Sequence, residues 1–195
     1  MTLAPVRTVA PAADLVSLAE AKAQCRVDDS DSDVLMTALI KAATDHLDGF
    51  SGVLGRALIT QTWAVDFGGF SDLMRLPVGN LLAVSSITYY DSANVQQTLA
   101  SSVWTTFTDA RGPYVMLKPG ESWPAAYDRP DAVRVTWTAG YGATSASVPA
   151  AIKQAALLLV GHWYDNRAAV NVGSSVAEVP FAVDALIAPF IRNRI

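Results

Sequence analysis

The chain is almost without cysteine and histidine. A single cysteine, Cys25, among 195 residues excludes an internal disulfide framework and fits a reducing compartment. The two histidines, His46 and His162, do not combine with one cysteine into any zinc-binding spacing. We therefore predict no metal site and no cofactor.

Charge is also scarce. Charged residues make up 16% of the chain, against about 25% in typical soluble domains, while apolar residues reach 51%. So little charge favours a chain whose surface is partly covered by subunit contacts. The net charge of −4 excludes the basic footprint of a non-specific nucleic-acid binder. It does not exclude a wall that nucleic acid slides past.

No apolar run is long enough for a membrane. The longest such run in the last long helix, residues 155–161, has seven residues, far below the roughly 20 of a membrane span. The first residues lack the charged-then-apolar pattern of a signal peptide. We expect a soluble protein that is made inside the cell and has no membrane partner.

Catalytic constellations are missing as well. The stretch Gly120-Glu121-Ser122-Trp123-Pro124 begins like a nucleophile elbow but ends in proline where glycine is needed. An enzyme remains conceivable only if His162 proves open to solvent beside a carboxylate such as Asp165. We predict no catalytic residues and no enzymatic activity.

Helical patterns occupy the first quarter of the chain. Residues 1–16 form an Ala/Pro-rich arm without periodicity, and Ser17 and Glu20 fit a capping box that opens a helix over 17–25. A second helix is predicted over 33–54, preceded by aspartates at 28, 29, 31 and 33 that we interpret as helix caps rather than a calcium loop. Its inner stripe comprises Leu35, Leu39, Ala42, Ala43, Leu47, Phe50 and Leu54.

From residue 56 to 141 the period changes to two. The clearest example is residues 133–139, where Val133, Val135 and Trp137 alternate with polar residues. Similar runs lie at 59–67, 73–76, 84–90, 103–108 and 114–118, and pairs such as Gly112-Pro113 mark turns between them. A long helix follows over 148–167 with Ser147 as its cap, and 168–195 is an extension with a short amphipathic helix. The class is α+β, a helical core with an inserted antiparallel β region, in one domain over 17–167.

The helix at 148–167 is apolar on nearly every side. Such a helix is buried all round, and we expect one face to meet the chain's own core and the other a neighbouring copy. The residues assigned to these two roles, which the sequence does not separate, are Leu158, Leu159, Gly161, Trp163 and Tyr164, with Leu35, Leu39 and Leu47 facing them.

Several segments, in their order and spacing, resemble a known family. They are LAEAKAQCRVDDSDSD with LIKAATDHLDGFSGVLGRALITQTW, LPVGNLLAVSSITYYD, SWP, VRVTWTAGYG, VPAAIKQAALLLVGHWYDNR and VPFAVDALIAPF. Together they resemble the head–tail connector, or adaptor, proteins of long-tailed bacteriophages and phage-derived gene transfer agents, over nearly the whole chain. A mild departure is the tail beyond Phe190, IRNRI, because related sequences often stop near a single arginine.

The resemblance implies a structural subunit of a ring, expected to be twelve-fold, in the virion neck. The ring would bind beneath the portal protein, extend the channel for double-stranded DNA without reading its sequence, and offer its far side to a stopper or tail-side neck protein. The resemblance also suggests that the amphipathic tail docks on the portal. The residues given this role are Phe181, Leu186, Ile187, Phe190, Ile191, Arg192 and Arg194.

Two alternatives stay open at the level of sequence. The tail helix can instead fold back on its own domain. The chain as a whole can also be a monomeric β-rich carbohydrate-binding module, with Trp104, Trp123 and Tyr127 as stacking residues. The module predicts an exposed aromatic platform, whereas the connector predicts buried tryptophans and self-association.

Overall fold

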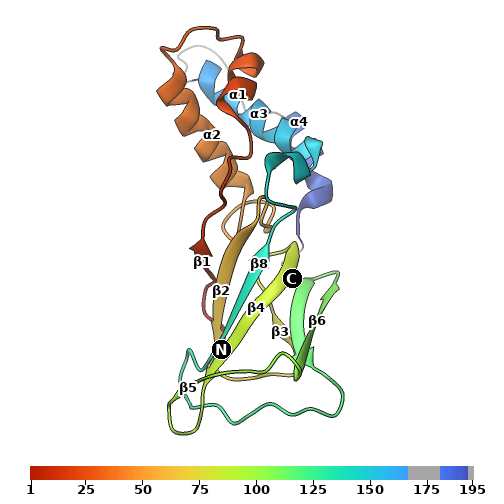
Figure 1. The fold of residues 1–195 in the computed structure, drawn as a ribbon. Coiled ribbons are helices and arrows are strands. Elements are labelled where there is room, and N and C mark those ends of the chain that lie inside the picture. The colour runs from red at the N-terminus through yellow and green to blue at the C-terminus, as the bar shows by residue number, and fades with distance from the viewer. Residues whose placement is uncertain (167–180, 193–195) are drawn as a thin grey trace.

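The computed structural model of the chain describes residues 1–166 and 181–192. Helices gather at one end of an elongated molecule and strands fill the other, as Figure 1 shows. The described helices are α1 (Leu18–Cys25), α2 (Asp33–Leu47), α3 (Ala150–Asp165) and α4 (Phe181–Ile187), with short 3₁₀ turns at Ser145–Ser147 and Ala188–Phe190. The predicted α+β class with antiparallel sheets is confirmed.

The start of α1 follows the predicted capping box. The Ser17 side chain accepts from the Glu20 backbone N–H, and the Glu20 carboxylate accepts from the Ser17 N–H at 2.7 Å. The predicted cap of α3 is wrong, because Ser147 lies in the 3₁₀ turn and Pro149 is the N-cap. Ser32, at the N-cap of α2, makes no side-chain capping bond.

Helix α2 ends at Leu47, earlier than predicted. Asp48 is already extended and Gly49 has a φ of +78°, which only glycine adopts readily. A Cβ at Gly49 would also lie 3.0 Å from the Trp63 ring. The buried face of the helix is Met36, Ile40, Ala43 and Leu47, while the predicted Ala42 is exposed.

The strands form two antiparallel sheets. The larger has the order β1-β2-β8-β4-β5, with β1 at Val6–Val9, β2 at Gln61–Phe67, β8 at Val133–Ala139, β4 at Leu81–Tyr90 and β5 at Gln96–Thr98. The smaller has the order β3-β7-β6, with β3 at Met74–Arg75, β7 at Gly112–Leu117 and β6 at Trp104–Asp109. Strand β1 lies in the arm for which no structure was predicted, and Gly112, expected in a turn, begins β7.

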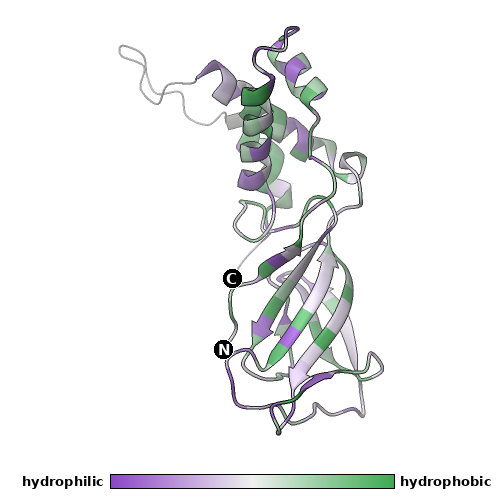
Figure 2. Cartoon of the chain, turned by 60° about the vertical axis from the view of Figure 1, so that its left-hand side comes forward, coloured by the Kyte–Doolittle hydropathy of each residue, from purple (hydrophilic) through white to green (hydrophobic). Residues whose placement is uncertain are grey.

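Each end of the molecule has its own core. In β8, Val133, Val135, Trp137 and Ala139 are fully buried and the residues between them are not, as the period of two predicts. Figure 2 shows this alternation of hydrophobic and polar residues along the strands. The helical core is built on Leu47, Ile152, Ala156 and Leu159 together with Val183 and Ile187 of α4. The two ends meet at the loop that joins α2 to β2.

Candidate functional site

The junction between the helical end and the larger sheet is organised by Asp48. Its side chain is buried and accepts hydrogen bonds from the Leu58 N–H at 2.8 Å and from Gln61 Nε2 at 2.9 Å. Arg7 of β1 reaches the same carboxylate, with Nη1 3.4 Å from Oδ2. Burial raises the pKa of Asp48 above its usual range, and the hydrogen bonds from Gln61 and Leu58 oppose that rise. Sequence reasoning missed this junction.

The residues predicted for core and subunit contact divide into two groups. Leu47 and Leu159 are completely buried in the helical core. The others, Leu35, Leu39, Leu158, Gly161, Trp163 and Tyr164, are half-buried. The Tyr164 and Ser32 hydroxyl oxygens lie 3.1 Å apart, which ties the end of α3 to the start of α2. Only the half-buried group retains surface that a neighbouring copy can contact.

Gly161 lies in a groove between the ends of α1 and α3. The groove has a volume of about 470 Å³ and is lined by Gln24, Cys25, Arg26, Leu158, Gly161, His162, Asp165 and Asn166. A Cβ at Gly161 would meet only the Gln24 side chain, at 3.9 Å, so nothing within the described chain requires glycine here. Close approach by another molecule would give this glycine a packing role.

The polar residues of this groove do not form a catalytic set. Burial raises the pKa of the Cys25 thiol, and the nearby Asp165 charge adds to the rise. Such a thiol is protonated at neutral pH and is a poor nucleophile. His162 is half-buried with Nδ1 3.4 Å from Asn166 Nδ2, and within the described chain no hydrogen bond or ion pair joins its ring to Asp165.

The C-terminal helix packs on the chain's own helical end. Val183 and Ile187 are buried in the helical core, while Leu186 and Phe190 pack against it and Ile191 is 46% exposed. The side chain of Phe181 and all of Arg194 lie outside the described residues. In the isolated chain the tail is therefore folded back, and its docking on a portal stays a prediction.

Arg192 lies against the smaller sheet. Its Nε and Nη2 donate to the Arg111 carbonyl at 2.9 and 2.7 Å, and Nη2 also donates to the Leu76 carbonyl at 3.0 Å. Its backbone N–H donates to the Leu54 carbonyl at 3.0 Å. These partners are backbone oxygens of the same chain.

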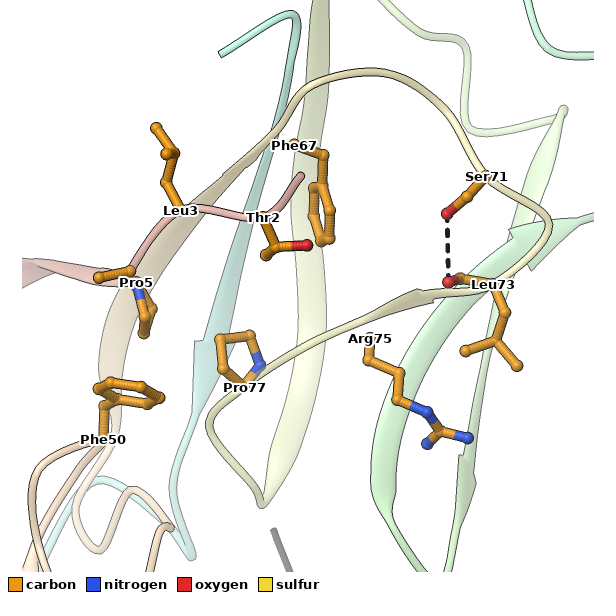
Figure 3. Close-up of a pocket in the computed structure, with 10 residues that line it drawn as sticks. Thr2, Leu3, Pro5, Phe50, Phe67, Ser71, Leu73, Arg75 and Pro77 are labelled. Atoms are coloured by element: carbon orange, nitrogen blue, oxygen red, sulfur yellow. Dashed lines mark hydrogen bonds between the residues drawn. The ribbon is translucent and has the colours of Figure 1, made fainter. Parts of the chain in front are cut away.

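A second groove, of about 500 Å³, separates the N-terminal arm from β3. Pro5, Phe50 and Pro77 lie together on one side of it, and the Arg75 guanidinium points away from them (Figure 3). That guanidinium makes a paired contact with Asp109, with N–O distances of 2.9 and 2.8 Å. The groove thus has apolar walls and no unpaired charge at Arg75.

The acidic loop before α2 does not cap the helix as predicted. The Asp29 carboxylate accepts from the Asp31 N–H inside the loop, and Asp33 pairs with Lys22 at 2.7 Å. Across the described residues, no group of three or more His, Cys, Asp or Glu side chains is placed to hold a metal ion.

Sequence comparison finds one family. Residues 15–109, which run from just before α1 to the end of β6, match the model of phage gp6-like head-tail connector proteins. This match supports a head–tail connector over the part of the chain that it covers. None of the curated proteins matches the chain's sequence significantly.

Solved structures share the chain's fold over nearly its whole length. A chain in a structure of the neck of an empty gene transfer agent particle, computed with C6 symmetry, matches with a TM-score of 0.79 at 22% identity. Chains in the virion of a native gene transfer agent particle and in the native neck with C12 symmetry give TM-scores of 0.76 and 0.71 at 22% and 21% identity. Each match covers 99% of this chain and 97% of the other chain.

The aromatic residues proposed for the alternative carbohydrate-binding module do not form a platform in this chain. Trp123 stacks on Phe70 with ring centroids 4.7 Å apart, and Trp104 packs against the core of the β end. Of the three proposed stacking residues only Tyr127 is exposed. None of the helices in the described part of the chain has the length and hydropathy of a membrane span.

Proposed function

We propose that the chain is a structural subunit of a ring in the neck of a tailed phage or gene transfer agent particle. The observation that carries this proposal is the end-to-end fold similarity to chains of gene transfer agent necks, together with the family match over residues 15–109. The symmetries in those structures, C6 and C12, support a closed ring. We infer twelve copies, joined by heterologous contacts in which one patch meets a different patch on the next copy.

The ring has a partner at each end in this proposal. It binds beneath the portal protein, with the C-terminal segment nearest the portal, and its far side receives a stopper or tail-side neck protein. The elongated shape, with helices at one end and sheets at the other, suits a subunit that spans between two partners (Figure 1). The subunit is made in the bacterial cytoplasm and ends in the virion.

Double-stranded DNA passes through the ring without sequence-specific binding. The net charge of −4 supports this role, because a mildly acidic protein does not hold the phosphate backbone. The proposed subunit performs no chemistry on the DNA. It is a wall of the channel.

Between neighbouring copies, the contact uses the half-buried residues near the end of α3. The groove at Gly161 is open in the single chain, and Leu158 lines it. The outer side of α2 offers exposed apolar and small residues, Val34, Ala38 and Ala42, with Val34 86% exposed. These are two different patches of one chain, as a heterologous contact requires.

The native mass of the purified chain tests the ring directly. Light scattering on a sizing column is expected to show a discrete species near twelve copies of the 20.7 kDa chain, about 250 kDa. The same measurement with the cognate portal protein covers a ring that forms only on a template. A chain that stays monomeric alone and does not join the portal would contradict the proposal.

A further inference from the structure

The C-terminal segment runs from the helical end to the smaller sheet (Figure 1). Its first part is fixed in the helical core, where Val183 is 1% and Ile187 2% exposed. Beyond α4, the Phe190 carbonyl accepts from Arg56 Nε at 2.7 Å, and the Arg192 N–H donates to the Leu54 carbonyl at 3.0 Å. Residues 181–192 are thus attached to the helices and to the loop between α2 and β2 before they reach the smaller sheet.

At the smaller sheet, Arg192 contacts two backbone segments that are distant in sequence. Its guanidinium donates to the carbonyl of Leu76, just after β3, and to that of Arg111, in the turn between β6 and β7. Hydrogen bonds from a charged donor are about twice as strong as neutral ones. One side chain therefore joins two segments of the β3-β7-β6 sheet.

The turn between β6 and β7 is shaped to receive this guanidinium. Gly112 has a φ of +115°, and a Cβ at this position would lie 2.3–2.6 Å from the guanidinium atoms of Arg192. Asp109 holds the other side of the turn by accepting from the Arg111 N–H at 2.8 Å and pairing with Arg75. The missing side chain of Gly112 is the space that Arg192 occupies.

From these contacts we propose that residues 181–192 form a strap that holds the smaller sheet in place relative to the helical end, with Arg192 against Gly112 as its fastening. The strap couples the docking of the tail to the mobility of the β6–β7 hairpin. A partner that draws the tail away must loosen the hairpin, and a partner that clamps the hairpin must favour the docked tail. This coupling to a partner rests on the proposed function, whereas the strap itself does not.

Hydrogen exchange of the full-length chain tests the strap. Arg192→Ala is expected to speed amide exchange in residues 104–117 by about tenfold, the effect of losing a charge-assisted hydrogen bond. Arg111→Ala is the matched control, because it removes an exposed arginine side chain from the same turn and leaves the accepting carbonyl in place. Exchange in β8 serves as an internal reference and is expected to stay unchanged in both variants. Equal exchange of the hairpin in Arg192→Ala and in the unaltered chain would overturn the proposal.

A double-mutant cycle keeps the test valid if one variant is poorly folded. Gly112→Ala carries backbone strain at positive φ and, if the strap is fastened, a clash with the guanidinium. We expect Gly112→Ala to speed hairpin exchange less in the Arg192→Ala background than alone, since only the strain remains there. Arg192→Lys keeps the charge but not the forked geometry, so its rate of hairpin exchange is expected to fall between those of the unaltered chain and Arg192→Ala. Additive effects would show that Arg192 and Gly112 are not coupled. All of these measurements use the isolated chain. A result that contradicts the strap would therefore not contradict the ring, which is tested separately by the native mass.

Discussion

At the scale of single residues, Glu20 combines two stabilising roles. Its carboxylate accepts from the Ser17 N–H and from Lys153 Nζ at 2.9 Å. The backbone hydrogen bond from Ser17 and, next, the hydrogen bond from Lys153 lower the pKa of Glu20 to about 2. A carboxyl group whose folded-state pKa is lowered stabilises the fold above its unfolded pKa and loses that effect as pH falls.

We predict that Glu20→Gln lowers the free energy of unfolding at pH 7 by about 1 kcal/mol, the typical value of a helix cap. Urea unfolding at a series of pH values measures this. The difference between the variant and the unaltered chain is expected to shrink as pH falls from about 4.5 towards 2, the window set by the pKa shift. Glu121→Gln, an exposed loop position, is the control and is expected to change nothing. A difference that is constant with pH would contradict the assigned role.

The pKa of Asp48 is shifted in the opposite direction to that of Glu20. Because burial raises its folded-state pKa, the fold binds a proton more readily than the unfolded chain, and stability from this group falls as pH rises through that raised pKa. We predict that the difference in stability between Asp48→Asn and the unaltered chain moves in favour of the variant as pH rises above the ordinary aspartate pKa of 3.8. Asp48→Ala is expected to lose about 3 kcal/mol at pH 7, because it leaves the buried Leu58 N–H and the Gln61 amide without their acceptor. Thermal unfolding across pH checks both, and Asp72→Asn, at an exposed loop position, is the control.

At the scale of elements, α3 separates the stability of the chain from its assembly. Gly161 sits inside the helix with open space at its Cβ, so Gly161→Ala is expected to raise the free energy of unfolding by roughly 0.5–1 kcal/mol. If the groove is a subunit contact, Gly161→Leu keeps the fold and removes the high-mass species in light scattering. Gln154→Leu, exposed on the same helix, is the matched control and should assemble normally. Full assembly of Gly161→Leu would remove the groove from the contact.

The sequence was most informative where one local rule decides the structure. The alternation in β8 and the Ser17–Glu20 capping box are set by near neighbours, and both are as predicted. The end of α2 was not predictable in this way, because Asp48 leaves the helix to bind Leu58 and Gln61, ten and thirteen residues further on. Strand β1 has four exposed residues in a row, so it gives no alternation to detect.

The candidate surfaces were predictable only in part. Family resemblance and the all-apolar pattern of α3 make this helix a candidate contact, but they do not separate Leu159, which is fully buried, from Gly161, which lines an open groove. Arg192 binds backbone carbonyls. Because every residue has a backbone carbonyl, the residue types in the sequence do not indicate these partners. The Gly112-Pro113 pair indicated a turn, whereas the reason for glycine is a guanidinium that arrives from about 80 residues away in sequence.

At the scale of the whole molecule, two cores are joined at one junction and crossed by one strap. Arg7 from the N-terminal strand and Arg192 from the C-terminal segment both reach this region, from opposite ends of the chain. In an elongated subunit of this build, these contacts are routes by which a change at one end can reach the other. A neck component that contacts one partner at each end would use that property.

The tail offers a sharper test of portal docking than its deletion. Removing residues 179–195 also removes Val183 and Ile187 from the helical core, so loss of binding by that truncation would not separate docking from unfolding. Ile191 is 46% exposed, and we predict that Ile191→Asp weakens binding to the cognate portal protein at least about tenfold while the unfolding temperature stays the same. Val9→Asp, at a 57% exposed valine of β1, is the matched control and is expected to bind normally. Binding can be measured by co-sedimentation of each full-length variant with purified portal rings. If Ile191→Asp binds as well as the control, the exposed side of the tail is not the portal contact, and a docked tail would have to present the face that the chain itself now buries.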